Sequence, residues 1–595
     1  DVSGTDNDAN GNTGYGFNAL DAITTGDYNT AIGDQAGTNI NGGNANTLVG
    51  KDAGDSLTSG SNNIAIGFDS LQNEDTGNNN IAIGRQALFT QNYDGDAYNI
   101  AIGYQAGFAV TTGTTNTLIG GLAGDALTEG NHNTVLGYGA LSNETLGDRN
   151  VAVGSNALYA QNNTSNVDAY NVAVGYNAGA AVTTGVRNTL IGGLAGDAMT
   201  SGVDSVAVGH NALGALTIGH NNVAIGKDAL STSVDGDYNV AVGYEALKVY
   251  EDGDGNGFNT AVGSRSQLSA TTGEFNTSLG SLSMGAGVTT GDYNVAVGYN
   301  TGSALTSGTQ NTIVGAHAGD SLTTGANNVA IGFEALATED AHSFNVAVGH
   351  RALKTQNAGA SAYNTALGYN AGLSVTTGTL NTVIGGLAGD AITTGGSNTA
   401  VGQEALTAET TGSHNIAIGR EASRYSALSN RSISIGYAAL QAQANSSLTD
   451  TYNIAIGHVA GSAITTGLRN TLIGGFAGDG LTTGQRNVAI GYGALSSEDT
   501  HNYNVAIGDS ALNQLNAGAN GYNVAIGYSA GHDMTTGVHN TIVGGLAGDA
   551  LTTGADNVAL GVNALSTEDT GNRNVAIGRD ALKLQDAGTD GYNTA

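Results

Sequence analysis

The feature that most constrains this sequence is a repeat of 17 residues. When the chain is aligned on the glycine of N-x-x-[IVL]-G, that glycine recurs at 33 positions from Gly16 to Gly578, and 25 of the 32 intervals are 17 residues long. Asn stands four residues before the aligned glycine in 31 units, and Ser205 and Ser432 replace it in the other two. Such a regular period is typical of arrays in which each unit packs on its neighbours.

The pattern inside each unit predicts an all-β fold. The segment N-x-A-I-G alternates as a strand does, and the T-G or D-T-G that follows is turn sequence. No stretch keeps a helical period, and 17 residues is the length of one coil of a β-solenoid. We therefore expect a repetitive parallel β-solenoid (β-roll) with two short strands in each coil. At about 4.8 Å per coil, 33 coils would form a rod of roughly 160 Å.

We expect residues 1–595 to form one continuous array of 33 coils. Because the chain begins at Asp1 and stops partway through a repeat, we expect terminal caps or an anchor to lie outside this fragment. The longer intervals predict longer loops near 88–98, 158–170, 247–258, 353–363, 440–452, 512–522 and 582–592.

Composition excludes several classes of function. The chain has 95 Gly and no Pro, Cys or Trp, and the absence of Pro indicates that its backbone N–H groups are needed as donors. A formal charge of −33 argues against binding nucleic acid or an anionic membrane. No apolar run is long enough to insert into a bilayer, and without Cys there is no disulfide framework.

The repeated positions predict structural roles. We expect the Asn side chains to form a hydrogen-bonded ladder from coil to coil, and the aligned glycines to lie at positive φ or where backbones approach closely. We expect the Ile, Val and Leu rows to stack and to bury apolar surface. The ladder and glycine positions singled out are Asn29, Asn46, Asn63, Asn99, Asn116, Asn133, Asn222 and Asn540, with Gly33, Gly50, Gly103, Gly120 and Gly137.

One stretch, NTLIGGLAGDALTEGNHNTVLG from Asn116 to Gly137, has the glycine content of a phosphate-binding loop. A Walker loop also needs Lys for the phosphates and a hydroxyl for Mg²⁺, and this stretch lacks both at the required positions. Asp125 would repel a phosphate. Closely similar segments also recur at four other places in the chain, which is unusual for a ligand site. We therefore interpret the GG pair as a tight corner of the coil.

Two segments open like a calcium loop, DNDANG and DGDGNG. The acidic ligand expected at position twelve is replaced by Phe17 and Gly263, so Ca²⁺ stays an alternative and we expect no cofactor. The candidate calcium ligands are Asp252, Asp254, Asn256, Asp6, Asp8 and Asn10.

The eleven His residues, such as His132, His210 and His414, stand at variable positions of the repeat. We expect them in solvated turns rather than in a zinc or catalytic site.

Tyrosines are the remaining candidates for contact with a ligand. Tyr104, Tyr176, Tyr244 and Tyr369 directly follow an aligned glycine. Aromatic rings in such rows can stack on sugars, so these residues are possible glycan contacts. The alternative, which we favour, is that they close the expanded loops and cover strand edges.

The repeat N-x-A-I-G-x-x-A, as in NIAIGYQAG from Asn99 and NVAIGRDAL from Asn574, resembles the head repeats of YadA-type trimeric autotransporter adhesins. It also resembles the repeats of bacteriophage tail-fibre-like proteins. The resemblance implies a left-handed β-roll in each subunit and a homotrimer around one axis. It further implies that Asn99, Ala101, Ile102, Gly103 and Ala106 form the roll and are not catalytic.

We therefore expect the structural shaft or head of an extracellular fibre or adhesin, which projects a binding tip from the surface of a cell or virion. The expected partner is the chain itself as a homotrimer. A host-cell receptor or surface glycan would bind through regions outside these residues. We expect no enzyme activity. The alternatives are a solenoid that itself binds glycans or Ca²⁺ along the shaft and, third, a fibre-borne polysaccharide depolymerase.

Overall fold

The computed structural model describes residues 9–251, 255–586, 588 and 590–595. By its internal contacts the chain divides into two compact units, Asp1–Tyr293 and Asn294–Ala595. We call them the N-terminal unit and the C-terminal unit. The described residues form strands, turns and bends but no helix, so the all-β parallel solenoid predicted from the period is confirmed.

The N-terminal unit contains sixteen strands of three residues among its described residues, one for each coil. They are β1 (Thr13–Tyr15), β2 (Thr30–Ile32), β3 (Thr47–Val49), β4 (Ile64–Ile66), β5 (Ile81–Ile83), β6 (Ile100–Ile102), β7 (Thr117–Ile119), β8 (Thr134–Leu136), β9 (Val151–Val153), β10 (Val172–Val174), β11 (Thr189–Ile191), β12 (Val206–Val208), β13 (Val223–Ile225), β14 (Val240–Val242), β15 (Thr260–Val262) and β16 (Thr277–Leu279).

The described part of the C-terminal unit continues the pattern with seventeen such strands and adds a separate pair, β25 and β27. The strands are β17 (Val295–Val297), β18 (Thr312–Val314), β19 (Val329–Ile331), β20 (Val346–Val348), β21 (Thr365–Leu367), β22 (Thr382–Ile384), β23 (Thr399–Val401), β24 (Ile416–Ile418), β25 (Ala427–Asn430), β26 (Ile433–Ile435), β27 (Ala444–Asp450), β28 (Ile454–Ile456), β29 (Thr471–Ile473), β30 (Val488–Ile490), β31 (Val505–Ile507), β32 (Val524–Ile526), β33 (Thr541–Val543), β34 (Val558–Leu560) and β35 (Val575–Ile577).

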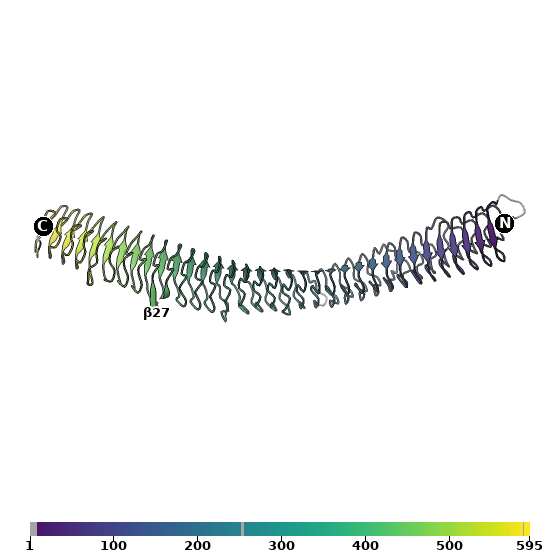
Figure 1. Ribbon diagram of the computed structural model, residues 1–595, viewed down its shortest axis with the longest axis horizontal. Coiled ribbons are helices and arrows are strands. Elements are labelled where there is room, and N and C mark those ends of the chain that lie inside the picture. Colours follow the sequence, from purple (N-terminus) through teal and green to yellow (C-terminus); the bar gives the residue numbers. More distant parts are fainter. Residues whose placement is uncertain (1–8, 252–254, 587, 589) are drawn as a thin grey trace. The chain divides into compact units, whose positions relative to one another are not determined.

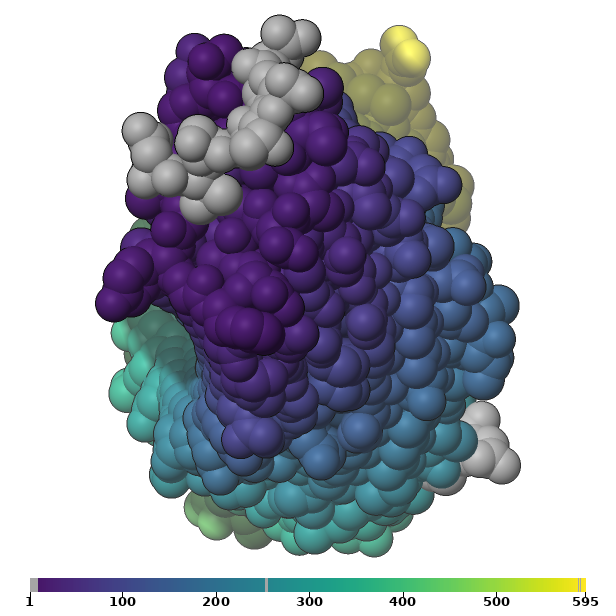
Figure 2. All heavy atoms as spheres, turned by 90° about the vertical axis from the view of Figure 1, so that its right-hand side faces the viewer, coloured from purple at the N-terminus to yellow at the C-terminus, as the bar shows by residue number. Residues whose placement is uncertain are grey.

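Within each unit every coil strand pairs in parallel with the strand of the next coil. In the N-terminal unit Ala101 of β6 lies opposite Leu118 of β7, which lies opposite Val135 of β8. The register keeps equivalent repeat positions together, because the offset equals the repeat length. The arrows of each unit accordingly lie side by side in chain order in Figure 1. Figure 2 shows successive coils of the N-terminal unit in close contact, from purple into blue.

The expectation of two strands in each coil is wrong, because the rest of the coil forms turns. These turns still bond to the next coil: the N–H of Gly107 donates to the carbonyl of Ala123 at 2.9 Å, and Thr111 donates to Thr128 at 3.0 Å. Each coil is thus hydrogen-bonded to its neighbour around most of its circumference. A proline at such a position would remove a donor, which explains why the chain contains none.

The core is a narrow column filled mainly by Ala and Leu. The central residue of each strand points inward, as Ala101 and Leu118 do, and both are fully buried. The outer residues, such as Ile100 and Ile102, are half-buried on the opposite face of the pleat. The Ile, Val and Leu rows therefore stack in register and bury part of their apolar surface, while the inward residue of each coil fills the core.

The ladder Asn residues lie inside the coil and connect it to both neighbours. The backbone N–H of Asn116 donates to Oδ1 of Asn99 at 2.9 Å, and Nδ2 of Asn116 donates to the carbonyl of Gly130 at 2.8 Å. Asn99 and Asn116 are fully buried. Oδ1 of Asn116 in turn accepts the N–H of Asn133 at 3.0 Å. Each ladder side chain therefore satisfies an N–H and a carbonyl group on the side of the following coil, which a hydrophobic residue could not do.

The aligned glycines form a column in which backbones nearly touch. Gly120 has a φ of 136°, and a Cβ built there would lie 2.4 Å from the carbonyl oxygen of Gly137. A glycine of the T-x-G turn, Gly113, has a similar constraint, since its Cβ would lie 2.6 Å from the carbonyl oxygen of Gly130. Glycine is required at both positions because neither leaves room for a side chain.

We predict that Asn222→Ala lowers the melting temperature much more than Asn162→Ala does. Asn222 is buried, its Nδ2 donates to Gly236 O at 2.7 Å, and its Oδ1 accepts from Asn239 N at 2.9 Å. Each buried group left unpaired costs about 1–3 kcal/mol, whereas Asn162 is exposed. Thermal denaturation followed by circular dichroism measures both, and equal shifts would contradict the ladder.

A second prediction compares the two glycines of the GG pair. Gly120→Ala should destabilise the N-terminal unit strongly, because its Cβ meets the backbone of Gly137. Gly121→Ala should change stability by less than about 0.5 kcal/mol, because its Cβ would lie 3.5 Å from Cδ2 of Tyr138, the nearest atom beyond its own chain neighbours. Urea denaturation of the two variants tests the difference, and a large loss for Gly121→Ala would show that the pair acts as one element.

Candidate functional site

Three successive N–H groups of the GGLAGDA corner, those of Leu122, Ala123 and Gly124, are hydrogen-bonded to carbonyl groups and are not available to a phosphate. The N–H of Leu122 donates to the carbonyl of Tyr104 at 2.8 Å, and that of Gly124 donates to Ala140 at 2.9 Å. The N–H of Ala123 turns back to Gly120 at 3.3 Å. These donors are used inside the coil stack, so the geometry is that of a corner and not of an anion site.

The predicted tyrosines occupy the same outward position of their repeats, and neighbouring side chains contact the faces of several rings. Tyr104, Tyr176, Tyr244 and Tyr369 are 49%, 60%, 40% and 56% exposed. The guanidinium of Arg85 lies 6.0 Å from the centroid of Tyr104. Lys227 and Arg265 lie 5.7 and 5.5 Å from the centroid of Tyr244, and the ring of Tyr369 stacks on a histidine of the preceding coil at 5.3 Å. Tyr244 therefore has a cation from each adjacent coil against its ring, whereas Tyr104 and Tyr369 each have one such ring contact.

A groove with a volume of about 690 Å³ lies elsewhere on the N-terminal unit. Tyr138 and Tyr159, 62% and 44% exposed, line it, and none of the predicted tyrosines does. Gly139 has no side chain at the repeat position where the next coil carries Asn156, and this leaves space beside Tyr138. The sequence signal for the groove is the word GYG at 137–139. The lining residues are Leu122, Asp125, Ala126, Tyr138, Gly139, Ser142, Asn143, Asn156, Tyr159, Asn177 and Ala180.

The groove also carries polar groups that could orient a ligand. Oγ of Ser142 donates to the carboxylate of Asp125, and burial raises the pKa of that carboxyl above its usual value. Nδ2 of Asn156 donates to Oδ1 of Asn177 at 3.2 Å. Exposed rings beside amide and carboxylate groups are a combination suited to hydroxyl-rich ligands such as saccharides.

A set of fully buried glutamates occupies one corner of the coil in both units. They replace the apolar residue found at the same place in other coils, such as Leu57 in the coil before Glu74. Oε1 of Glu74 accepts the N–H of Gly77 at 2.8 Å. Burial raises the pKa of the Glu74 carboxyl above its usual value, and the hydrogen bond from Gly77 opposes that shift. The fully buried glutamates among the described residues are Glu74, Glu144, Glu339, Glu409, Glu498 and Glu568.

The buried glutamates occur where the coil that follows changes its turn. In an ordinary turn the glycine N–H donates to the next coil, as Gly113 does to the carbonyl of Thr128 at 3.2 Å. After Glu74, the coil carries the longer loop near 88–98, and the carboxylate accepts the N–H of Gly77 instead. The glutamate carboxylate thus replaces the backbone carbonyl of the next coil, which accepts the glycine N–H in an ordinary turn. The sequence signal for these corners is an acidic segment such as E-D-T-G, at 74–77 and 568–571.

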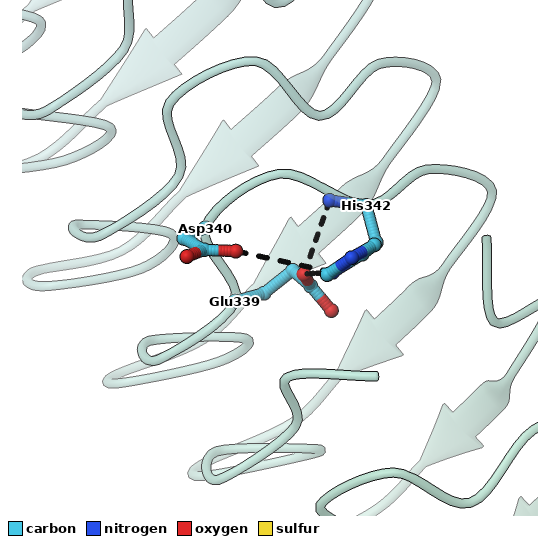
Figure 3. Close-up of side chains that lie close together, drawn as sticks. All are labelled: Glu339, Asp340 and His342. Carbon is cyan, nitrogen blue, oxygen red and sulfur yellow. Dashed lines mark hydrogen bonds and ion pairs between the residues drawn. The ribbon is translucent and has the colours of Figure 1, made fainter. Parts of the chain in front are cut away.

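Two of these turns, both in the C-terminal unit, carry a histidine in place of the glycine. Nδ1 of His342 lies 2.6 Å from Oε1 of Glu339 and 3.9 Å from Oδ1 of Asp340. Figure 3 shows the side chains of Asp340 and His342 on either side of Glu339. The Glu339 side chain is fully buried and that of His342 is 14% exposed. The expectation that the histidines lie in solvated turns is therefore wrong for His342.

The second such turn has the same geometry. Nδ1 of His501 lies 2.6 Å from Oε1 of Glu498 and 3.9 Å from Oδ1 of Asp499. Burial raises the pKa of the Glu498 carboxyl above its usual value, and the hydrogen bond from His501 opposes that shift. The signal that could have revealed both sites is the word E-D-x-H, which occurs at 339–342 and 498–501.

The candidate calcium ligands fall mostly outside the described part of the chain. Asp6, Asp8, Asp252 and Asp254 lie outside the described residues. Asn10 uses its backbone N–H to bond Oδ1 of an aspartate in the next coil at 2.6 Å, and Asn256 forms an isolated parallel bridge with the coil before it. Calcium binding at these segments stays an untested alternative.

Comparison with known proteins adds no relative. No protein-family model matches the chain, and no curated protein matches it. The resemblance to adhesin heads and tail fibres therefore rests on the repeat itself. In the part of the chain that the structure describes, no helix has the length and apolar character needed to cross a membrane.

Proposed function

We propose that this chain is the structural shaft or head of an extracellular fibre or adhesin that holds a binding tip away from a cell or virion surface. The observation that carries this proposal is the unbroken in-register pairing of coil strands within each unit, from β1 to β16 and from β17 to β35. At about 4.8 Å per coil, the sixteen coils of the N-terminal unit extend roughly 77 Å. A stack of this kind resists bending and leaves a protease few unpaired segments to bind.

The outward rows of the strands support self-association. Ile66, Leu136 and Ile191 of the N-terminal unit are 37%, 47% and 38% exposed, and Ile331 and Leu367 of the C-terminal unit are 36% and 47% exposed. Apolar rows that continue from coil to coil are unusual on the surface of a monomer. Covering them would remove apolar area from water at about 25 cal/mol per Å².

The period of these rows argues for a second copy of the same chain as the partner. A surface that covers them must present matching side chains at each coil, with the same rise of about 4.8 Å. The chain itself has that rise in every pair of strands. The resemblance to trimeric adhesin heads favours three copies around one axis, with the apolar rows facing that axis.

We predict a trimeric mass for the purified chain by light scattering coupled to size exclusion, and elongated particles by negative-stain microscopy. Ile66→Lys with Ile83→Lys places two charges in adjacent coils of one outward row, and this variant should shift the mass toward the monomer. The matched control is Asn73→Lys with Asn92→Lys, at exposed positions in the same two coils. A wild-type chain that stays monomeric at all concentrations would refute the assembly.

A second candidate function is saccharide binding along the shaft, and the groove around Tyr138 and Tyr159 is the observation that favours it. We predict that Tyr138→Ala with Tyr159→Ala abolishes binding of this fragment to any saccharide retained on a glycan array. Tyr369→Ala, which removes an exposed ring of the C-terminal unit, should leave that binding unchanged. Retention of the wild-type signal by the double variant would exclude the groove.

A further inference from the structure

The two E-D-x-H turns place three metal-ligand atoms together without a change in the fold. In each turn a carboxylate oxygen of Glu, a carboxylate oxygen of Asp and an imidazole nitrogen of His lie within 4.8 Å of one another. The turns at 339–342 and 498–501 lie nine coils apart, which corresponds to roughly 43 Å. They are therefore two independent copies of one arrangement.

The distances are close to those of a tetrahedral metal site. Ligand atoms about 2.0–2.1 Å from Zn²⁺ at tetrahedral angles lie roughly 3.3 Å from one another. The Glu339–His342 contact of 2.6 Å would lengthen and the Asp340–His342 contact of 3.9 Å would shorten, each by less than about 1 Å. Rotation of exposed Asp340 and of the imidazole supplies that change, while the fully buried carboxylate of Glu339 stays held by its turn.

An unsatisfied oxygen in the second turn is an independent observation. Oδ1 of Asp499, the atom 3.9 Å from Nδ1 of His501, is covered and accepts no hydrogen bond from any described residue, although the side chain as a whole is 45% exposed. A cation at this point would give this oxygen the partner that it lacks. The Asp499 side chain offers an oxygen within 4.8 Å of the ligand atoms of His501 and Glu498.

Equivalent turns elsewhere in the chain close without a histidine. In the turn Glu568–Gly571 the glycine N–H donates to Oε1 of Glu568 at 2.7 Å. The N–H of His501 makes the equivalent bond to Oε1 of Glu498 at 3.2 Å. Gly571 closes its turn without any side chain, so the imidazole of His501 adds a ligand to a turn that is already complete.

We propose that each E-D-x-H turn binds one transition-metal ion of the Zn²⁺ class through Nδ1 of His, Oε1 of Glu and Oδ1 of Asp, with water in the fourth position. The imidazole ligand favours Zn²⁺, Cu²⁺ or Ni²⁺ over Ca²⁺ and Mg²⁺, which prefer oxygen ligands only. The acidic surface of the chain raises the local concentration of cations. This proposal does not depend on the fibre function.

The test is isothermal titration of the full metal-free chain with Zn²⁺. We expect two ions per chain, with Ca²⁺ at least tenfold weaker, and a tetrahedral absorption spectrum when Co²⁺ replaces Zn²⁺. The variant His342→Gly with His501→Gly restores the turn sequence of the sister coils. It should lose both ions and keep the melting temperature of the metal-free wild type.

The matched control removes two other histidines. His132→Gly with His414→Gly changes residues that lie at φ of 58° and 62°, where glycine fits, and it should still bind two ions. His342→Gly alone should leave one. The proposal is overturned if the wild type binds no Zn²⁺, if the His342/His501 variant still binds two ions with unchanged affinity, or if the control loses them.

Discussion

Hydrogen bonding from each coil to the next is the interaction on which the rest of this structure depends. A coil of 17 residues has too little interior to bury its own backbone, so its N–H and C=O groups must be satisfied by neighbours. The strands, the turns and the buried Asn side chains all do this with the same offset. The glycine column follows from it, because bonding at this spacing brings Gly120 close to the carbonyl of Gly137.

The narrow interior also determines which side chains lie on the surface. Only one of the three strand residues points inward, and Ala or Leu most often fills that place, as Ala101 and Leu118 do. The larger β-branched residues are left on the outer face of the pleat, where Ile66 is 37% exposed. A single coil stack therefore carries its own unpartnered apolar rows, and this supports the proposal that copies of the chain pack on one another.

The candidate functional groups of this chain lie where the sequence departs from the repeat. Where an expanded loop follows, a buried glutamate such as Glu74 replaces an apolar corner residue and accepts the turn N–H. In two of these corners a histidine, His342 or His501, lies beside the buried glutamate, and each of these turns is a candidate metal site. At Tyr138, by contrast, a missing side chain at Gly139 opens a groove. All of these features need the regular coils around them to fix their geometry.

The sequence by itself determined the period, the strand in each coil, the register and the need for glycine and asparagine at fixed places. These follow from local chemistry and from the spacing of identical residues. Only the tertiary structure decided which rows face outward, because N-x-A-I-G alternates in the same way whichever face is buried. It also decided that His342 meets Glu339 and that Tyr138 and Tyr159 share a groove, because those contacts depend on the path of each turn and on residues in adjacent coils.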